Sequence, residues 1–111
     1  MAITQTRIDG SAEQLGTAVF TATADTAVTT IHLCNIASAA DASVNIYLLP
    51  SDGSTTTPTV NNKIYNQLTI QAKDTYIIDT EKMILGNGDK IFIEIPDSSG
   101  EIIATISTIG L

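Results

Sequence analysis

The 111-residue chain contains no tryptophan, one cysteine and one histidine, and charged residues make up only 15% of it. A single cysteine, Cys34, excludes a framework of internal disulfides. An intramolecular zinc site would need carboxylates in place of the missing cysteine and histidine ligands. The residue types alone therefore name no reaction, and they leave little for catalytic or metal chemistry.

Basic residues are also few. Twelve acidic residues oppose five basic ones, which gives a net charge of −7. The five basic residues are scattered along the chain: Arg7, Lys63, Lys73, Lys82 and Lys90. Binding to nucleic acid rests on clustered Lys and Arg, and so does attraction to an anionic membrane. We therefore expect neither nucleic acid nor a membrane as a partner.

Long apolar runs are absent as well. No segment approaches the roughly 18 apolar residues that span a bilayer. The first residues, MAITQTRIDG, lack the charged region and apolar core of a signal peptide. We expect the chain to be made and assembled in a cytosol.

What the sequence does contain is alternation of apolar and polar residues. Seven segments with this period or with β-favouring residues are separated by turn-forming ones: 16–23, 27–35, 43–49, 63–71, 75–79, 90–95 and 101–109. Seven strands at this spacing are typical of an all-β, two-sheet antiparallel β-sandwich, immunoglobulin-like or jelly-roll-like. The Cys…Trp…Cys core of a true immunoglobulin domain is missing. We expect residues 1–14 to form an N-terminal arm and residues 15–111 a single β-sandwich domain.

The stretch Asp74–Ile95 is predicted to form a strand, a corner and a second strand. Gly86-Asn87-Gly88-Asp89 is a turn signal, because glycine adopts positive φ without strain. It precedes a strand rather than a helix and lacks a following Lys-Ser/Thr, so it is not a phosphate-binding loop. Met83 is expected in one helical turn at most.

Two groups of residues have the types that reactive sites use. His32 and Cys34 share one face of a predicted strand, but a metal site or a Cys–His nucleophile needs further partners. The spacing of the acids that cluster in sequence matches no calcium loop: Asp74, Asp79, Glu81 and Asp89. Packed sheet residues and water-facing acids are the simpler interpretation, so we expect no metal, no cofactor and no enzymatic activity.

Aromatic residues are also sparse. Tyr47, Tyr65 and Tyr76 are accompanied by only two phenylalanines. Sugar-binding surfaces use exposed aromatic rings, so a carbohydrate- or receptor-binding module would show these tyrosines in an exposed row. Finding them buried would remove that alternative.

Several predicted strands are apolar on both faces, although a two-sheet sandwich needs only one buried face per strand. The extra apolar positions suggest subunit contacts. A long loop at 51–62, rich in turn-forming residues, is a second expected contact region. The candidate interface residues are Leu49, Thr56, Pro58, Phe92, Ile103 and Ile109. The competing explanation is that the loop or the N-terminal arm buries the apolar positions.

Three stretches carry a resemblance: TTIHLCN, SVNIYLLPSDGS and NNKIYNQLTIQAKDTYIIDTEKMILGNGDKI. Together they resemble small virion structural proteins of tailed bacteriophages, notably phages of marine bacteria and cyanobacteria. The likeness covers roughly residues 27–95 and consists of strands and turns, so no site residue is carried over.

This resemblance implies a non-enzymatic β-sandwich used in a phage virion and assembled in the host cytoplasm. We expect a capsid decoration or cement subunit that bridges the major capsid protein or other virion proteins. Homo-oligomeric clusters such as trimers are expected, because small β decoration proteins often sit at threefold positions. In a shell, avidity over many copies makes a modest interface sufficient. The alternatives are a neck, tail or fibre component, or the carbohydrate- or receptor-binding module.

Overall fold

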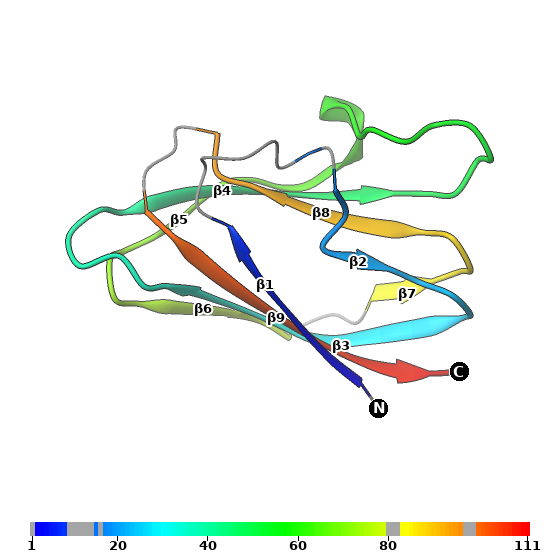
Figure 1. Cartoon of the computed structure of the whole chain (residues 1–111), viewed down its shortest axis with the longest axis horizontal. Helices are drawn as coiled ribbons and strands as arrows, with labels where there is room; N and C mark the ends of the chain where they lie inside the picture. Colours follow the sequence, from blue (N-terminus) through cyan, green and yellow to red (C-terminus); the bar gives the residue numbers. More distant parts are fainter. Residues whose placement is uncertain (1, 9–14, 16, 80–82, 97–99) are drawn as a thin grey trace.

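The computed structural model of the chain describes residues 2–8, 15, 17–79, 83–96 and 100–111. Nine strands run through these residues (Figure 1). They are β1 (Ala2–Ile8), β2 (Phe20–Thr21), β3 (Thr26–Asn35), β4 (Ala42–Leu49), β5 (Lys63–Ile70), β6 (Thr75–Ile78), β7 (Met83–Leu85), β8 (Lys90–Glu94) and β9 (Ile102–Gly110). A three-residue 3-10 helix, η2 (Val60–Asn62), precedes β5 and is capped by Thr59.

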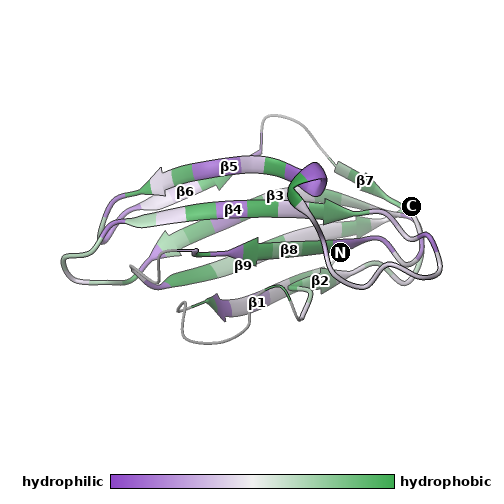
Figure 2. Ribbon diagram, turned by 90° about the horizontal axis from the view of Figure 1, so that it is seen from above, coloured by the Kyte–Doolittle hydropathy of each residue, from purple (hydrophilic) through white to green (hydrophobic). Residues whose placement is uncertain are grey.

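The strands form two antiparallel sheets that pack face to face. The five-stranded sheet has the order β1-β9-β3-β6, with β7 also paired to β3, and the four-stranded sheet has the order β2-β8-β4-β5. Figure 2 shows the second sheet lying over the first. The prediction of an all-β, two-sheet antiparallel sandwich is confirmed.

The pairing order identifies the type of sandwich. The first strand pairs with the last, β2 pairs with β8, β3 pairs with β6 and β7, and β4 pairs with β5. The chain is thus one long antiparallel hairpin whose tip is the segment 50–62, rolled up into two sheets. If β6 and β7 are counted as one interrupted strand, this is the eight-stranded jelly roll.

Alternation of side chains places the core between the sheets. Ile31 and Leu33 of β3 and Ile102 and Ile106 of β9 point inward from one sheet and are fully buried. Val44, Ile46, Ile91 and Ile93 point inward from the other. Since side chains in a strand alternate between faces, the same strands present a second, outward row to the outside.

Three elements differ from the sequence-based expectation. Residues 2–8 of the expected arm form an edge strand of the five-stranded sheet, whereas 9–14 lie outside the described residues. The expected strand 16–23 is reduced to Phe20–Thr21, because only these residues pair with β8. Met83–Leu85 is a strand and not a helical turn, since it pairs with Thr26–Val28 of β3.

Candidate functional site

The outer face of the five-stranded sheet gathers apolar side chains that the core does not use. Register places Ile84, Ala27 and Ile109 side by side across β7, β3 and β9. Further along the sheet, Ile77 lies beside His32, and Ile103 lies beside Cys34. The face of these five strands that points away from the other sheet therefore contains several apolar side chains.

The exposure of these side chains is high for isoleucine. Ile3 is 66% exposed, Ile84 63%, Ile77 51% and Ile109 43%. Single exposed apolar residues are normal, but several on one sheet face point to an interaction surface. Hydroxyl and amide side chains such as Thr105, Ser107 and Gln5 fill the positions between them.

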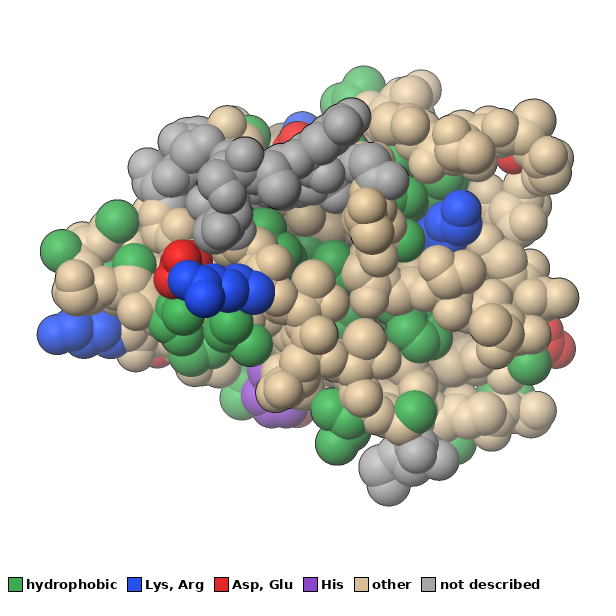
Figure 3. Space-filling view, viewed as in Figure 1, with side chains coloured by type: hydrophobic (Ala, Val, Ile, Leu, Met, Phe, Trp, Pro, Cys, Tyr) green, Lys and Arg blue, Asp and Glu red, His purple; other side chains and the backbone are tan. Residues whose placement is uncertain are grey.

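Charge is almost absent from this face although the whole chain carries −7. Within the five strands, Arg7 on β1 holds the one formal charge. Its guanidinium lies 2.5 Å from the Glu101 carboxylate, and both side chains retain contact with water. Figure 3 looks at the sandwich from the side on which β1 lies, where the surface is mostly tan with scattered green and few red or blue side chains.

His32 and Cys34 lie on this same face, and both are half-buried. Their cross-strand neighbours are Ile77, Thr105, Thr75 and Ile103, none of which is a metal ligand of the usual kind or a general base. Among the described residues no group of three His, Cys, Asp or Glu side chains is placed to hold a metal ion.

The outer face of the four-stranded sheet is different, because another segment of the chain covers part of it. Leu49 and Phe92 are 4% and 1% exposed, and with Tyr47 they form a second small core under Leu15 and Ala18. The prediction that Leu49 and Phe92 are interface residues does not agree with this burial. The competing explanation expected burial under the 51–62 loop or the N-terminal arm of residues 1–14, whereas the described residues that cover this small core, Leu15 and Ala18, follow the arm.

The other four candidate interface residues divide between the tip loop and β9. Thr56 is exposed, but Pro58 is buried. Ile103 is half-buried and Ile109 is exposed, and both lie on the outer face of the five-stranded sheet. Two of the six residues therefore belong to the exposed apolar surface that the structure singles out.

A polar cluster stands beside the covered small core. Asn45 and Tyr47 both donate hydrogen bonds to one oxygen of Glu94, at 3.0 and 2.7 Å. Asn45 also accepts from the backbone N–H of Gln67, which has a positive φ of 56° and interrupts the register of β5. Burial, together with the bond to the Glu94 carboxylate, raises the pKa of Tyr47 to about 12. A phenol held protonated in this way stabilises the sheet and is no proton donor at neutral pH.

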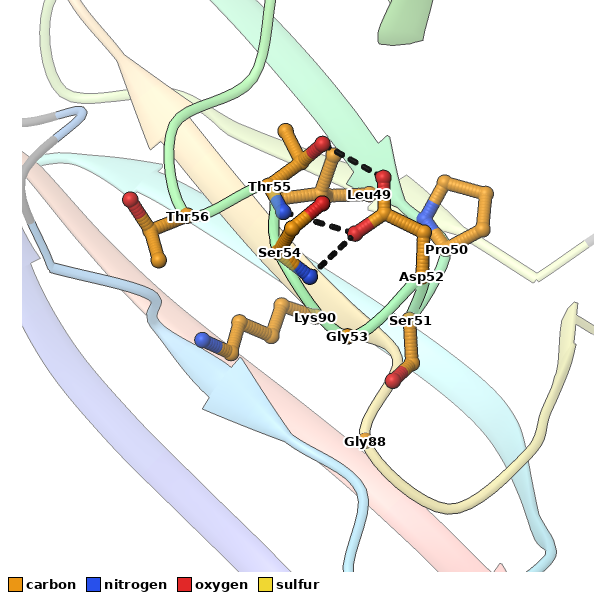
Figure 4. A pocket seen from close by; sticks show the side chains of 10 residues that line it. All are labelled: Leu49, Pro50, Ser51, Asp52, Gly53, Ser54, Thr55, Thr56, Gly88 and Lys90. Atoms are coloured by element: carbon orange, nitrogen blue, oxygen red, sulfur yellow. Dashed lines mark hydrogen bonds between the residues drawn. The ribbon is translucent and has the colours of Figure 1, made fainter.

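The tip loop encloses a polar hollow of about 190 Å³, drawn in Figure 4. Asp52 organises it by accepting bonds from the backbone N–H groups of Ser54 and Thr55 and from the Thr55 hydroxyl. The hydrogen bond from the Thr55 hydroxyl, followed by those from the two backbone N–H groups, lowers the pKa of Asp52 to about 2. The Asp52 carboxylate already accepts hydrogen bonds from its own loop. It therefore holds the shape of the hollow and does not act there as a reactive acid.

A second hollow of about 240 Å³ opens between the two sheets where β5 faces β6 and β7. It is lined by Leu48, Ile64, Tyr65, Ile78 and Met83. All five side chains are apolar or aromatic, and among these described lining residues the Tyr65 phenol is the one titratable group. It resembles the unfilled edge of a sandwich, and among the described lining residues one hydroxyl, that of Tyr65, is available to orient a small ligand.

The clustered acids serve the backbone. Asp89 accepts from the N–H groups of Gly86 and Ser51, both at 2.9 Å, and so ties the β7–β8 turn to the tip loop. Asp74 accepts from the N–H of Thr75, and Asp79 is exposed. Glu81 lies outside the described residues.

No family model matched the chain, and searches of characterised proteins and of solved structures found no match. Within the part of the chain that the structure describes, no helix is long and apolar enough to cross a membrane. Function must therefore be argued from the surfaces just described.

Proposed function

We propose that the chain is a non-enzymatic structural subunit of a tailed-phage virion, namely a decoration subunit on the outside of the capsid. It would bind the major capsid protein or a neighbouring virion protein and act as a homo-oligomer. The outer face of the five-stranded sheet is the main contact surface. The tip loop, which includes Thr56, is a secondary contact.

The observation that carries this proposal is the combination of exposed isoleucines and missing charge on that face. The core of a protein–protein interface is depleted in charged residues. A sheet face that contacts only water normally carries charged and polar side chains. Here the five strands contain no acid, so the net charge of the rest of the chain favours solubility while this face can pack against a partner.

The acidic balance also favours a position outside the shell, away from packaged nucleic acid, because like charges repel. The jelly roll is among the folds used by viral capsid and lectin domains. Since one fold hosts many functions, this supports the proposal by analogy only. The resemblance over roughly residues 27–95 points in the same direction.

Nothing in the arrangement of the tyrosines favours the carbohydrate- or receptor-binding alternative. Tyr47 is buried and Tyr65 packs against the main core, whereas Tyr76 is 41% exposed but belongs to the other sheet. The three rings form no exposed row. A neck, tail or fibre position would use the same packing surface, and the number of copies per particle separates it from decoration.

The test uses particles assembled without this chain, to which purified chain is added back. The variant Ser107→Glu places a charge on the outer face between Thr30 and Ile3. Its matched control, Thr69→Glu, adds the same charge at an exposed position of β5 in the other sheet. Bound chain is counted by quantitative mass spectrometry, after thermal unfolding shows that both variants are folded.

We expect the wild type and Thr69→Glu to bind in numbers comparable to the capsid protein, and Ser107→Glu to bind about tenfold less or weaker still. Equal binding of the two variants would contradict the assigned surface. Failure of the wild type to bind any particle would contradict the virion assignment itself.

A further inference from the structure

The sheet edges of this sandwich are not equally protected. Each sheet ends in strands with one neighbour, which are templates for pairing unless they are short, irregular or charged. Strand β2 has two residues, β6 four and β7 three. Strand β5 is longer, but two register shifts and the positive φ of Gln67 break it.

Strand β1 is the exception. It runs for seven residues, Ala2–Ile8, and stays in unbroken register with β9 along its whole length. It contains no proline, glycine or acidic residue, and its register holds no bulge. In Figure 1 it crosses in front of β9 at the margin of the sheet. Arg7 is its one charged residue, and none of the other usual devices that blunt an edge strand is present within it.

The direction of its backbone groups follows from the ladder. The N–H of Ile36 donates to the carbonyl of Glu101 at 2.8 Å, so 36 and 101 are a hydrogen-bonded pair. Bonded and non-bonded pairs alternate in an antiparallel ladder, and successive residues of β9 bond to opposite neighbours. The odd residues of β9 therefore bond to β3 and its even residues bond to β1. Since even residues of β9 lie opposite even residues of β1, the even residues of β1 bond to β9. The backbone groups of Ile3 and Gln5 consequently point away from the sheet.

The sequence of β1 is self-complementary when two copies run antiparallel. In the register where all seven residues overlap, Gln5 lies opposite Gln5, Ile3 opposite Arg7 and Thr4 opposite Thr6. Threonine pairs across strands are favourable, and no like charges lie opposite one another. The one charged side chain of β1, Arg7, is already paired with Glu101 of its own chain, so the pairing of two β1 strands brings no acid of one strand opposite an acid of the other.

We propose that two copies of this chain pair β1 to β1 about a twofold axis at Gln5. The two five-stranded sheets then become one continuous sheet of ten strands. Their outer faces join into one surface with twice the area and very little charge. This pairing does not depend on membership in a virion, and it makes the basic unit a twofold dimer rather than a trimer.

Proline at position 5 tests the pairing with little damage to the fold. The N–H of Gln5 points outward, so Gln5→Pro takes no hydrogen bond from β1–β9, and proline is tolerated at such edge positions. Gln5→Ala is the matched control. Both variants lose the side-chain bond from Gln5 to the Thr105 hydroxyl (3.1 Å), but only proline removes the outward N–H.

Purified chain is measured by light scattering after size exclusion over a dilution series. We expect the wild type and Gln5→Ala to reach a mass twice that of the 11.7 kDa chain. Gln5→Pro should associate about tenfold more weakly or worse, because two central hydrogen bonds are lost per dimer. A wild type that stays monomeric at every concentration, or a Gln5→Pro dimer as tight as Gln5→Ala, would overturn the proposal.

Cysteine cross-linking tests the register without relying on proline. In a Cys34→Ser background, Gln5→Cys places two thiols in one hydrogen-bonded pair, where Cα atoms about 5.5 Å apart are within disulfide range. Ile3→Cys places each thiol opposite Arg7, so no bridge forms. We expect mild oxidation to give a covalent dimer with Gln5→Cys only. Equal cross-linking of the two variants, or none with Gln5→Cys, contradicts the pairing.

Discussion

Asn35 is the residue on which several separate segments depend. It is fully buried at the end of β3, and its side-chain amide donates to the carbonyls of Ala40 and Ile70, at 2.9 and 3.0 Å. Its side-chain oxygen accepts from the N–H groups of Ala37 and Glu101, at 3.1 and 3.2 Å. All four bonding positions of the amide group are used. The residue thereby joins the β3–β4 connection, the end of β5 and the start of β9.

Replacing Asn35 with alanine should destabilise the fold by about 3 kcal/mol or more, because buried backbone groups lose their partners. The control is Asn61→Ala in η2, an exposed position where the change should cost less than about 0.5 kcal/mol. Urea unfolding gives both values. A loss below about 1 kcal/mol for Asn35→Ala would show that water replaces the amide.

The sequence alone does not reveal this role, although Asn35 was assigned to a strand. A lone asparagine at a strand end has the same local pattern whether it caps a turn or faces water. Its partners Ile70 and Glu101 are distant in sequence, and only the packed sheets bring them to it. The same reason hides the Asn45–Glu94 contact, in which Asn45 occupies an outward position of β4.

Strands with strong alternation and apolar residues were predictable, and strands made by pairing were not. Residues 27–35 and 101–109 have inward rows of isoleucine and leucine, and both appear within a residue of the expected bounds. The segment 2–8 alternates too, but its inward row is mostly small and polar, Ala2, Thr4 and Thr6, so burial gave no signal. Tertiary pairing with β9 makes it a strand.

Two glycines with positive φ separate conformational cost from steric cost at the turns. Gly100 (φ 80°) precedes β9, and a Cβ there would lie 2.7 Å from the Cβ and 3.2 Å from the Cα of buried Ala42. Gly53 (φ 84°) in the tip loop has no atom within 4 Å of such a Cβ. The two positions share a backbone conformation and differ in their surroundings.

We expect Gly53→Ala to cost about 1 kcal/mol, from the left-handed backbone alone. Gly100→Ala should cost about 2–4 kcal/mol, since the new methyl group also pushes into the start of β4. Thermal or urea unfolding of both variants measures the difference. Equal losses would mean that the chain near residue 100 moves aside without strain.

At the scale of the whole molecule, fold class was predictable and topology was not. Turn signals and alternation specify strands, but they do not say which strands pair. Both a jelly roll and an immunoglobulin-like sandwich fit seven such segments. The pairing of β1 with β9 decides between them, and the sequence predicts an arm rather than a strand where β1 lies. Likewise, the same pattern in sequence is shared by Leu49, Phe92, Ile103 and Ile109, and only the packing of Leu15 and Ala18 shows which two are covered.

Because the chain has a net charge of −7, its self-association should depend on salt concentration. Two such molecules repel at low ionic strength, whereas the proposed β1–β1 contact contains no ion pair between copies that salt could weaken. The Debye length falls from ~30 Å at ~0.01 M to ~8 Å at ~0.15 M salt, so repulsion fades while backbone bonds and apolar contacts remain. We therefore expect the dimer to become tighter as salt is raised over this range, measured by sedimentation velocity.

Thr69 provides the matched pair for this prediction, because it is exposed on β5, in the sheet that does not contain β1. Thr69→Lys and Thr69→Glu change the net charge by one unit in opposite directions without touching the contact. At low salt the lysine variant should dimerise more tightly than the wild type and the glutamate variant less tightly, and the three should converge at high salt. Dissociation on adding salt would show that ion pairs hold the copies together, and would place the contact at the acidic strand ends instead of β1.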